Sequence, residues 1–206
     1  MIETLFKKNR IIGTVGNAGT GKTSLNLNEI IKVKEKFNIP VCVLGVEENL
    51  IPYLESKGIV ILQSKEDILD LKIKNSLICI EEFGDLFSTT TRDKQLDRLK
   101  RFFNRIDHLN DYLLISSARE NFWNKMMCGV VKCFLIKEIT YDSLTNGTTL
   151  KRKILGLTSN SDYRLEMKKE EYFIVTEDEP VKLKSFKYNK SLDSKKENIN
   201  PFEEKE

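Results

Sequence analysis

Short apolar runs alternate with amphipathic stretches along the first 140 residues of the chain. Each run is bounded by Gly, Pro or polar residues and is long enough for one strand. The predicted strands span residues 10–15, 41–46, 59–62, 76–80, 112–115 and 130–139. Strands that are apolar almost throughout are typical of a parallel sheet buried on both faces. The pattern therefore predicts an α/β fold, with a mostly parallel sheet flanked by helices.

Helices are expected between these strands, over residues 21–37, 49–57, 64–71 and 94–110. In the last of them the apolar positions recur at steps of three and four residues, which places them on one face. These positions are Leu96, Leu99, Phe103 and Ile106. The opposite face carries three arginines at the same kind of spacing, Arg98, Arg101 and Arg105. We expect a helix with one side in the core and a basic side in solvent.

The C-terminal part of the chain predicts an antiparallel addition to the sheet. Asn146-Gly147 is a strong signal for a two-residue hairpin turn, and it separates the strand that ends at Ile139 from a run over residues 148–157. Residues 172–176 predict one more strand, whereas residues 187–206 are polar and predict a mobile tail. We expect residues 1–186 to form a single domain with a C-terminal antiparallel hairpin.

Composition limits the function classes. The chain has 206 residues, of which 40% are hydrophobic and 32% charged, so it is neither collagen-like nor wholly disordered. The four cysteines form no Cys-x-x-Cys pair and His108 is the single histidine, which disfavours zinc and serine-hydrolase chemistry. The longest apolar run, residues 126–136, is interrupted by Lys132 and too short to span a bilayer. Because no secretion leader is visible either, we expect an intracellular protein.

Positive charge is concentrated in one segment. The net charge is +3, but residues 92–105 hold six cations and two anions, a net +4, so the rest of the chain sums to −1. A basic helix face of this kind can contact nucleic-acid phosphates, contact a nucleotide across a subunit interface, or only keep the protein soluble.

Residues 16–23 read Gly-Asn-Ala-Gly-Thr-Gly-Lys-Thr and match the phosphate-binding pattern G-x-x-x-x-G-K-[ST] at every defined position. A predicted strand precedes the motif and a predicted helix follows it, which is the context that the pattern requires. Its glycines allow backbone N–H groups to surround a phosphate, Lys22 reaches the β- and γ-phosphates, and the Thr23 hydroxyl ligates Mg²⁺. We therefore predict that ATP with Mg²⁺ is bound by residues Gly16, Asn17, Ala18, Gly19, Thr20, Gly21, Lys22, Thr23 and Ser24.

Two adjacent carboxylates follow the apolar strand over residues 76–80. Carboxylates are poor core residues unless they have partners, so a role in chemistry is expected. We predict that Glu81 holds Mg²⁺ and that Glu82 orients and polarises the attacking water. Asp85 is a competing partner for the metal.

These features together resemble the FtsK–HerA superfamily of DNA-translocating ATPases, and in size the small genome-packaging ATPases of membrane-containing icosahedral viruses. The residues that carry the resemblance are the loop over 16–23, the strand ending in Glu81-Glu82, the arginine-bearing helix and the segment from Tyr112 to Arg119. The resemblance implies a RecA-like P-loop NTPase core, with the catalytic strand inserted beside the P-loop strand, in a ring homo-oligomer around double-stranded DNA. It also implies a location in the host cytoplasm, with virion vertex or membrane proteins as possible partners.

Further roles follow from the same resemblance. Ring ATPases of this kind complete each site with an arginine from the next subunit, for which Arg92 and Arg119 are the first candidates. The arginines of the basic face, Arg98, Arg101 and Arg105, are candidates for contacts with nucleic acid. The family's polar sensor, commonly Gln, is replaced here by Ser116-Ser117-Ala118, with Ser117 as the candidate. The Glu-Glu pair is a second departure, because the family usually has Asp-Glu.

Other P-loop proteins remain alternatives. A small-molecule or nucleotide kinase shares the P-loop, but it gains little from two acids at the end of a buried strand, and no Arg-rich lid is evident. A GTPase needs Asn-Lys-x-Asp, whereas Asn189-Lys-Ser-Leu192 lacks the Asp. An assembly ATPase of the Zot type has the same core and a protein substrate, but usually also a membrane segment.

Overall fold

The computed structural model describes residues 2–70, 74–87, 93–118, 130–140, 164–165, 167–176, 179–187 and 189–192. Its strands are β1 (Ile11–Val15), β2 (Val41–Leu44), β3 (Val60–Leu62), β4 (Leu77–Ile80), β5 (Tyr112–Ser117), β6 (Cys133–Ile136), β7 (Ile139–Thr140), β8 (Arg164–Leu165), β9 (Glu171–Thr176) and β10 (Lys182–Ser185). Its α-helices are α1 (Ile2–Phe6), α2 (Lys22–Phe37), α3 (Ile51–Ser56), α4 (Lys65–Leu69), α5 (Phe83–Leu86) and α6 (Asp93–His108), and its 3-10 helices are η1 (Glu48–Leu50) and η4 (Lys190–Leu192). The strands expected before residue 130 are all present, and the strand expected over 130–139 is divided into β6 and β7.

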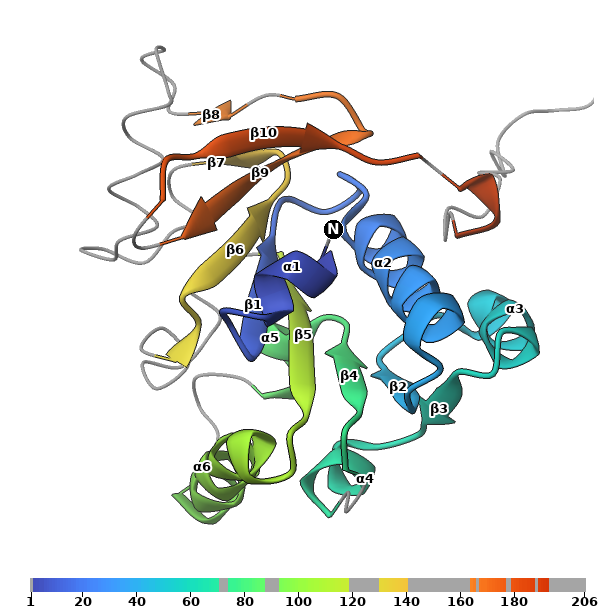
Figure 1. The fold of residues 1–206 in the computed structure, drawn as a ribbon, viewed down its shortest axis with the longest axis vertical. Helices are drawn as coiled ribbons and strands as arrows, with labels where there is room; N and C mark the ends of the chain where they lie inside the picture. Colours follow the sequence, from blue (N-terminus) through green and yellow to red (C-terminus); the bar gives the residue numbers. More distant parts are fainter. Residues whose placement is uncertain are drawn as a thin grey trace, which may run out of the picture.

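Eight strands form one sheet in the order β10-β9-β6-β1-β5-β4-β2-β3. The strands from β6 to β3 are parallel, whereas β9 runs antiparallel to β6 and β10 antiparallel to β9 (Figure 1). This confirms a mostly parallel sheet that ends in a C-terminal antiparallel hairpin. β5, the strand that ends in Ser116 and Ser117, lies between β1 and β4, so a strand is inserted beside the P-loop strand and the strand that leads to the glutamates is the next one along the sheet.

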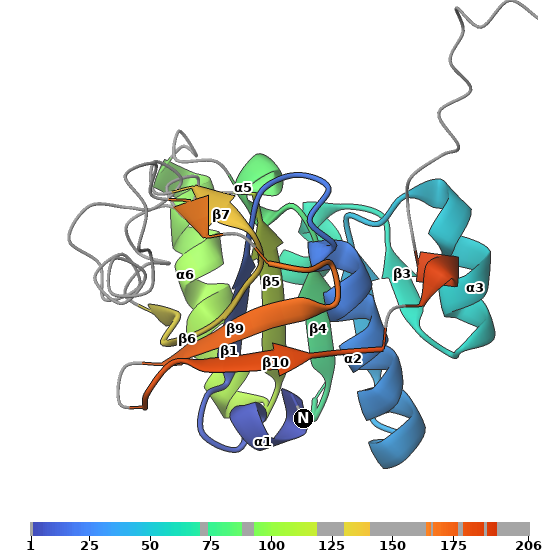
Figure 2. The same ribbon diagram turned by 90° about the horizontal axis from the view of Figure 1, so that it is seen from above.

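Helices cover both faces of the sheet, as the apolar strands predicted. One core cluster joins α1, α2 and α3 to one face, and the other joins α4, α5 and α6 to the opposite face. Figures 1 and 2 show α1 and α2 on one side of the sheet and α5 and α6 on the other. Within the described ranges, every helix is too short or too polar to cross a bilayer.

Local sequence signals correctly predicted the start of one helix and the buried face of another. The Ser64 side chain accepts from the Asp67 backbone N–H and Asp67 accepts from that of Ser64, a capping box that begins α4. In α6, Leu99, Phe103 and Ile106 are buried, as the periodicity predicted, and Phe102 is buried beside them. The stripe is wider than expected, because Phe102 packs against Phe103 with ring centroids 5.4 Å apart, and Phe103 in turn lies 6.3 Å from the ring of Phe83 on α5.

The C-terminal hairpin differs from the expected one. The antiparallel pair on the main sheet is β9–β10, and the short strand β7 pairs with β8, with Ile139 opposite Leu165. The turn expected at Asn146-Gly147 and the run over residues 148–157 lie outside the described residues.

Part of the segment expected to be a tail packs on the core. Leu192 is fully buried, its carbonyl accepts a 2.9 Å hydrogen bond from Ser24 Oγ, and Asn189 Nδ2 donates to the Tyr53 hydroxyl at 3.2 Å. Leu192 therefore attaches this polar stretch to α2, and the folded unit extends to Leu192 at least. Residues 193–206 lie outside the described part of the chain.

Candidate nucleotide-binding site

The predicted phosphate loop connects β1 to α2, at the ends of the parallel strands where their carboxyl termini gather. Gly19 and Gly21 have φ of 75° and 89°, the left-handed region that only glycine adopts at little cost. At Gly16 a Cβ would lie 2.6 Å from the Cβ of Lys137, so the loop begins in close contact with the end of β6. The Asn17 N–H donates to the Glu138 carbonyl at 2.7 Å and anchors it there.

The residues of the motif surround a hollow. A cavity of about 240 Å³ is lined by Ala18, Gly19, Gly21, Lys22, Thr23 and Ser24 together with Gly45, Glu47, Glu82 and Lys169. Asn17 and Thr20 line a neighbouring cavity, which shares Ala18, Gly19 and Lys169 with the first. The first N–H groups of α2 have no partners within the helix, so this end favours an anion. A cavity with this lining and volume has room for a phosphate chain.

Lys22 is almost fully buried, with its ammonium inside the loop. Its Nζ donates to the Asn17 carbonyl at 3.2 Å and lies 3.9 Å from Glu82 Oε1. Burial lowers the pKa of Lys22, and the nearby Glu82 and Glu81 carboxylates act in the opposite direction. A partly desolvated ammonium in this position is a strong electrostatic partner for an entering phosphate.

Glu81 is buried at the end of β4 and accepts several hydrogen bonds. Thr23 Oγ1 donates to Glu81 Oε2 at 2.9 Å, Ser116 Oγ donates to the same oxygen at 2.7 Å, and Asn26 Nδ2 donates to Oε1 at 2.7 Å. Thr14 Oγ1 in turn donates to Asn26 Oδ1 at 2.6 Å, which fixes the orientation of the amide. The carboxylate is therefore held against the threonine that was predicted to ligate Mg²⁺.

Glu82 follows with a different environment. Its φ is 48°, in the left-handed region, and its backbone N–H donates to Ser116 Oγ at 3.1 Å. Its side chain is 44% exposed and faces the cavity, so it reaches water that Glu81 cannot reach. Burial raises the pKa of Glu82, while the Lys22 ammonium acts to lower it. A carboxylate with a raised pKa and access to water suits a general base.

Ser116 contacts both glutamates, whereas Ser117 was the candidate sensor predicted from the sequence. Successive side chains of a strand point to opposite faces. Leu114, two residues before Ser116, packs in the core cluster of α2, whereas Ile115 packs in that of α6. Ser116 therefore shares the α2 side with Glu81, and the parallel pairing of β4 and β5, with Ile80 opposite Ile115, indicates this contact. Ser117 is buried, and its predicted role stays a prediction.

Asp85 does not share the contact with Thr23. It is exposed on α5, and its backbone N–H donates to the Glu82 carbonyl at 2.9 Å. Within the described ranges, no group of three or more His, Cys, Asp or Glu side chains could hold a metal ion. A bound Mg²⁺ would need oxygens from phosphates and water as well as Thr23, which is the usual manner of its binding in nucleotide sites.

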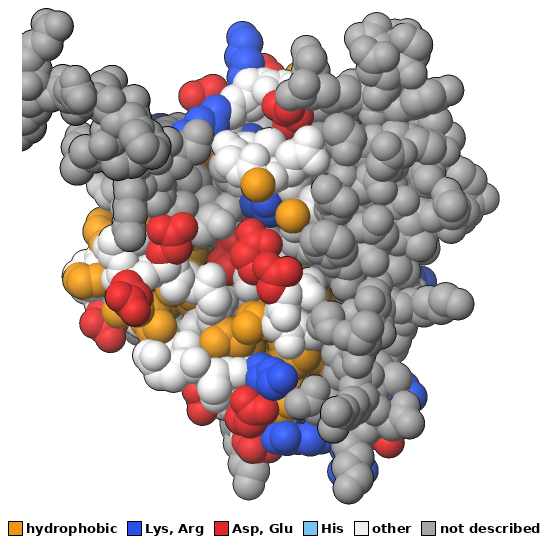
Figure 3. Space-filling model, turned by 180° about the vertical axis from the view of Figure 1, so that it is seen from behind, with side chains coloured by type: hydrophobic (Ala, Val, Ile, Leu, Met, Phe, Trp, Pro, Cys, Tyr) orange, Lys and Arg blue, Asp and Glu red, His pale blue; other side chains and the backbone are white. Residues whose placement is uncertain are grey.

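The basic face of α6 is partly engaged with α4. Arg98 Nη2 lies 3.1 and 3.2 Å from the two carboxylate oxygens of Asp70, and Arg105 Nη2 donates to the carbonyls of Ile68 and Leu69 at 3.4 and 3.3 Å. Arg101 is exposed. Figure 3 views the side of the molecule that α4–α6 cover, and at its lower end basic and acidic side chains lie next to one another. Arg92 and Arg119 lie outside the described residues.

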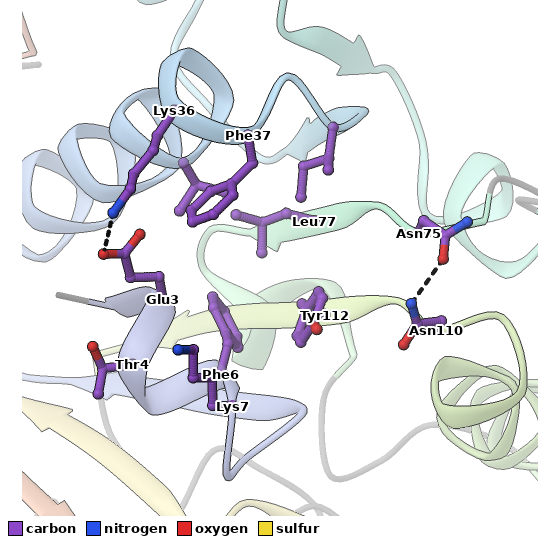
Figure 4. A pocket seen from close by; sticks show the side chains of 12 residues that line it. Glu3, Thr4, Phe6, Lys7, Lys36, Phe37, Asn75, Leu77, Asn110 and Tyr112 are labelled. Atoms are coloured by element: carbon purple, nitrogen blue, oxygen red, sulfur yellow. Dashed lines mark hydrogen bonds and ion pairs between the residues drawn. The ribbon is translucent and has the colours of Figure 1, made fainter.

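A second hollow lies at the opposite end of the sheet, between α1 and the C-terminal end of α2 (Figure 4). It has a volume of about 440 Å³, and Phe6, Phe37 and Leu77 contribute apolar walls. The polar side chains at its rim bond to one another, as in the 2.7 Å contact between Lys36 Nζ and Glu3 Oε1. None of the predicted site residues lines it.

No family model and no curated protein matches the sequence. The fold is shared with solved structures. The genome packaging NTPase B204 from Sulfolobus turreted icosahedral virus 2, in complex with ATP-gammaS, has a TM-score of 0.61 at 12% identity over 85% of this chain and 96% of that chain. The cytoplasmic domain of the Thermomonospora curvata type VII secretion ATPase EccC has a TM-score of 0.60 at 12% identity, over 89% of this chain and 24% of that chain. The N-terminal domain of zonular occludens toxin from Neisseria meningitidis has a TM-score of 0.50 at 11% identity, over 89% and 96% of the two chains. These likenesses confirm that the chain has the RecA-like P-loop NTPase fold expected from its resemblance to FtsK–HerA ATPases.

Proposed function

We propose that the protein is an ATPase whose hydrolysis of ATP drives the translocation of double-stranded DNA, as a subunit of a viral genome-packaging motor. The ATPase part of the proposal rests on one observation, the different environments of two adjacent carboxylates. Glu81 is buried and bonded to Thr23 Oγ1, whereas Glu82 faces the cavity 3.9 Å from the Lys22 ammonium. This difference supports a role for Glu81 beside the metal and for Glu82 beside the attacking water of a hydrolytic P-loop site.

The hydrogen bond between Thr23 and the buried Glu81 carboxylate indicates that this site is suited to Mg²⁺. The Thr23 hydroxyl uses its proton on Glu81, so its lone pairs are directed away from that carboxylate and are available to a cation. Thr23 would hold Mg²⁺ directly, and Glu81 would hold it directly or through water. The bound ion would neutralise charge on the β- and γ-phosphates.

The chain's own groups would perform the remaining steps. The loop N–H groups and Lys22 bind the phosphates, and Glu82 Oε1 accepts a proton from the water that attacks the γ-phosphorus. The bond from that phosphorus to the bridging oxygen of ADP breaks, which leaves ADP and inorganic phosphate. Ser116 is a positioning residue, because it bonds both Glu81 and the backbone N–H of Glu82.

The translocase part rests on resemblance and charge. The solved structure of B204 is described as that of a genome-packaging NTPase, and this chain covers nearly the whole of it. On α6, Arg101 is exposed and is therefore the most accessible of the three predicted DNA contacts, because Arg98 and Arg105 contact α4. In a ring, Arg92 or Arg119 would supply the arginine that acts on a neighbouring subunit's nucleotide.

Two other functions remain as alternatives. An assembly ATPase of the Zot type has the same fold and acts on protein, and the likeness to the zonular occludens toxin domain favours it second. A nucleotide or small-molecule kinase would use the same loop, but it has no need for a water-facing Glu82.

The deciding experiment is the ATPase rate measured with and without double-stranded DNA. Stimulation by DNA supports the translocase, whereas turnover that DNA leaves unchanged supports the assembly ATPase, and absent turnover argues for the kinase. DNA affinity should fall with salt by about 0.9 log units per log unit of salt for each phosphate neutralised. Arg101→Ala should reduce that slope by about one contact, roughly 0.9.

A further inference from the structure

A buried lysine, Lys137, lies beside the start of the phosphate loop and has no role in the proposed hydrolysis. Lys137, which follows β6, is fully buried, and its backbone N–H donates to the Val15 carbonyl at 2.8 Å. Its Nζ donates to the Lys169 carbonyl at 2.5 Å and to the Glu171 carbonyl, and it lies 5.3 Å from the centre of the Phe186 ring. Burying an ammonium costs free energy unless such partners stabilise it. A lysine buried at this position therefore calls for a functional explanation.

The partners of Lys137 belong to the turn that leads into β9. This turn is closed by a 2.9 Å hydrogen bond from the Glu171 N–H to the Lys168 carbonyl, and the Phe186 N–H donates to the Glu170 carbonyl at 2.9 Å. In Figures 1 and 2 the turn lies next to the start of α2. Lys137 therefore connects the turn that precedes β9 to the phosphate loop.

The turn brings Lys169 to the phosphate end of the cavity. A Cβ at Gly21 would lie 3.6 Å from Lys169 Cγ, and only Cδ, Cε and Nζ extend beyond that point. Lys169 lines the cavity that is also lined by Lys22, Thr23 and Glu82, and it lines the neighbouring cavity as well. Its side chain is half-buried between the two.

The balance of charges around the cavity indicates a role for the Lys169 side chain. The described lining holds Glu47 and Glu82 as anions and Lys22 and Lys169 as cations. A triphosphate brings several negative charges into this partly desolvated space. A single ammonium would leave most of that negative charge unneutralised. A second ammonium opposite the first would offset it.

We propose that Lys169 is a second phosphate-binding residue, supplied within the same subunit, and that Lys137 is the positioning residue that holds its turn over the loop. The inference rests on the proposed nucleotide site. It adds a contact from the C-terminal hairpin, which shares no part of the sequence motif that predicted the site.

The test measures affinity for ATPγS in the presence of Mg²⁺, and for tripolyphosphate as a competitor without a nucleoside. Lys169→Met should weaken both by about tenfold or more, because a charge-assisted contact to phosphate is lost. Lys169→Arg should restore most of the affinity. Lys168→Met is the matched control, since Lys168 is exposed on the same turn and lines neither cavity, and it should change neither ligand by more than about twofold.

Several outcomes would overturn the inference. Unchanged affinity in Lys169→Met does so, and so does a loss confined to ATPγS, which would place Lys169 at the nucleoside. The proposed function is judged separately, by whether wild-type protein binds ATPγS in a manner that depends on Lys22. If it does and Lys169→Met has no effect, only this inference is wrong; if it does not, both are wrong.

The positioning role is tested by a double-mutant cycle. Lys137→Met should weaken ATPγS binding in the wild-type background but add little to Lys169→Met, because both act through one side chain. Additive losses of affinity would mean that Lys137 does not act through Lys169. A merely structural role of Lys137 would lower thermal stability, and its effect on affinity would be the same whether or not Lys169 is present. If Lys137→Met does not fold, Lys137→Gln, which keeps a donor, takes its place in the cycle.

Discussion

Lys22 and Glu82 form an ion pair across the cavity, with Nζ 3.9 Å from Oε1 and the lysine almost fully buried. The phosphate-binding cation and the proposed base are therefore partners of one another. A triphosphate that enters the loop competes for the same ammonium. Binding of substrate would release Glu82 to accept a hydrogen bond from water, which couples occupancy of the site to readiness of the base.

Lys22→Ala should weaken ATPγS binding by about 100-fold, because a buried charge-assisted phosphate contact is lost. Titration calorimetry or a fluorescent nucleotide measures the change. Lys7→Ala, an exposed lysine on the far side of the molecule, is the control and should bind as wild type does. Equal affinity in Lys22→Ala and wild type would show that phosphates do not bind at this loop.

Glu82→Gln should retain ATP and lose hydrolysis. Removing a general base typically lowers kcat by about 10²- to 10⁴-fold, while affinity should hold or rise because Lys22 no longer has a carboxylate to pair with. Phosphate release and ATPγS binding are measured on the same preparation. Normal turnover would place the base at another residue.

Ser116→Ala should lower both kcat and thermal stability. It removes a donor to the buried Glu81 and an acceptor for the Glu82 N–H, and a buried polar group left without its partner costs about 1–3 kcal/mol. Ser117→Ala is the companion variant, and the ratio of the two kcat values decides which serine acts beside the glutamates. If only Ser117→Ala impairs turnover, the sequence-based choice of that residue was right.

The acid limb of the pH–rate profile should lie above the ordinary value of a glutamate. Burial raises the pKa of Glu82 from 4.5, and only the ionised carboxylate can accept a proton from water. The hydrolysis rate should therefore rise as pH increases through this raised value. An acid limb at or below 4.5 would contradict the role given to Glu82.

Lys137 should make stability depend on alkaline pH. Burial lowers its pKa from 10.5 to about 8 in the folded chain, so between these values the unfolded chain binds more protons. The free energy of unfolding contributed by this group then rises with pH across that window. Urea unfolding at several pH values should show a rise in wild type that is smaller in Lys137→Met. Parallel curves for the two proteins would mean that the ammonium is not perturbed.

Some parts of the site were accessible without a structure because they are local in sequence. The phosphate loop, Lys22 and Thr23 occupy eight consecutive positions, and the spacing alone specifies their chemistry. The adjacent glutamates were visible for a similar reason, since two acids at the end of an apolar run need partners or a role in chemistry. The amphipathic periodicity of α6 likewise predicted which of its sides faces the core.

Other parts depend on which segments lie side by side. Arg98 and Arg105 look free in the sequence, but the structure engages them with α4, which lies about 30 positions earlier in the chain. Asn26 and Ser116 have ordinary sequence surroundings, and each becomes a partner of Glu81 only when α2 and β5 meet beside β4.

The sequence by itself determined the class of fold, the loop and the two acids, because continuous apolar runs, a helical period of about 3.6 and contiguous motifs need only local backbone geometry. Only the tertiary structure decided that β5 separates β1 from β4, that Ser116 rather than Ser117 contacts Glu81, and that Lys137 holds a distant turn beside the loop. Those arrangements arise from strand order and from hydrogen bonds between residues far apart in the chain. No local pattern specifies them, because the free energy that selects them comes from packing of the whole sheet.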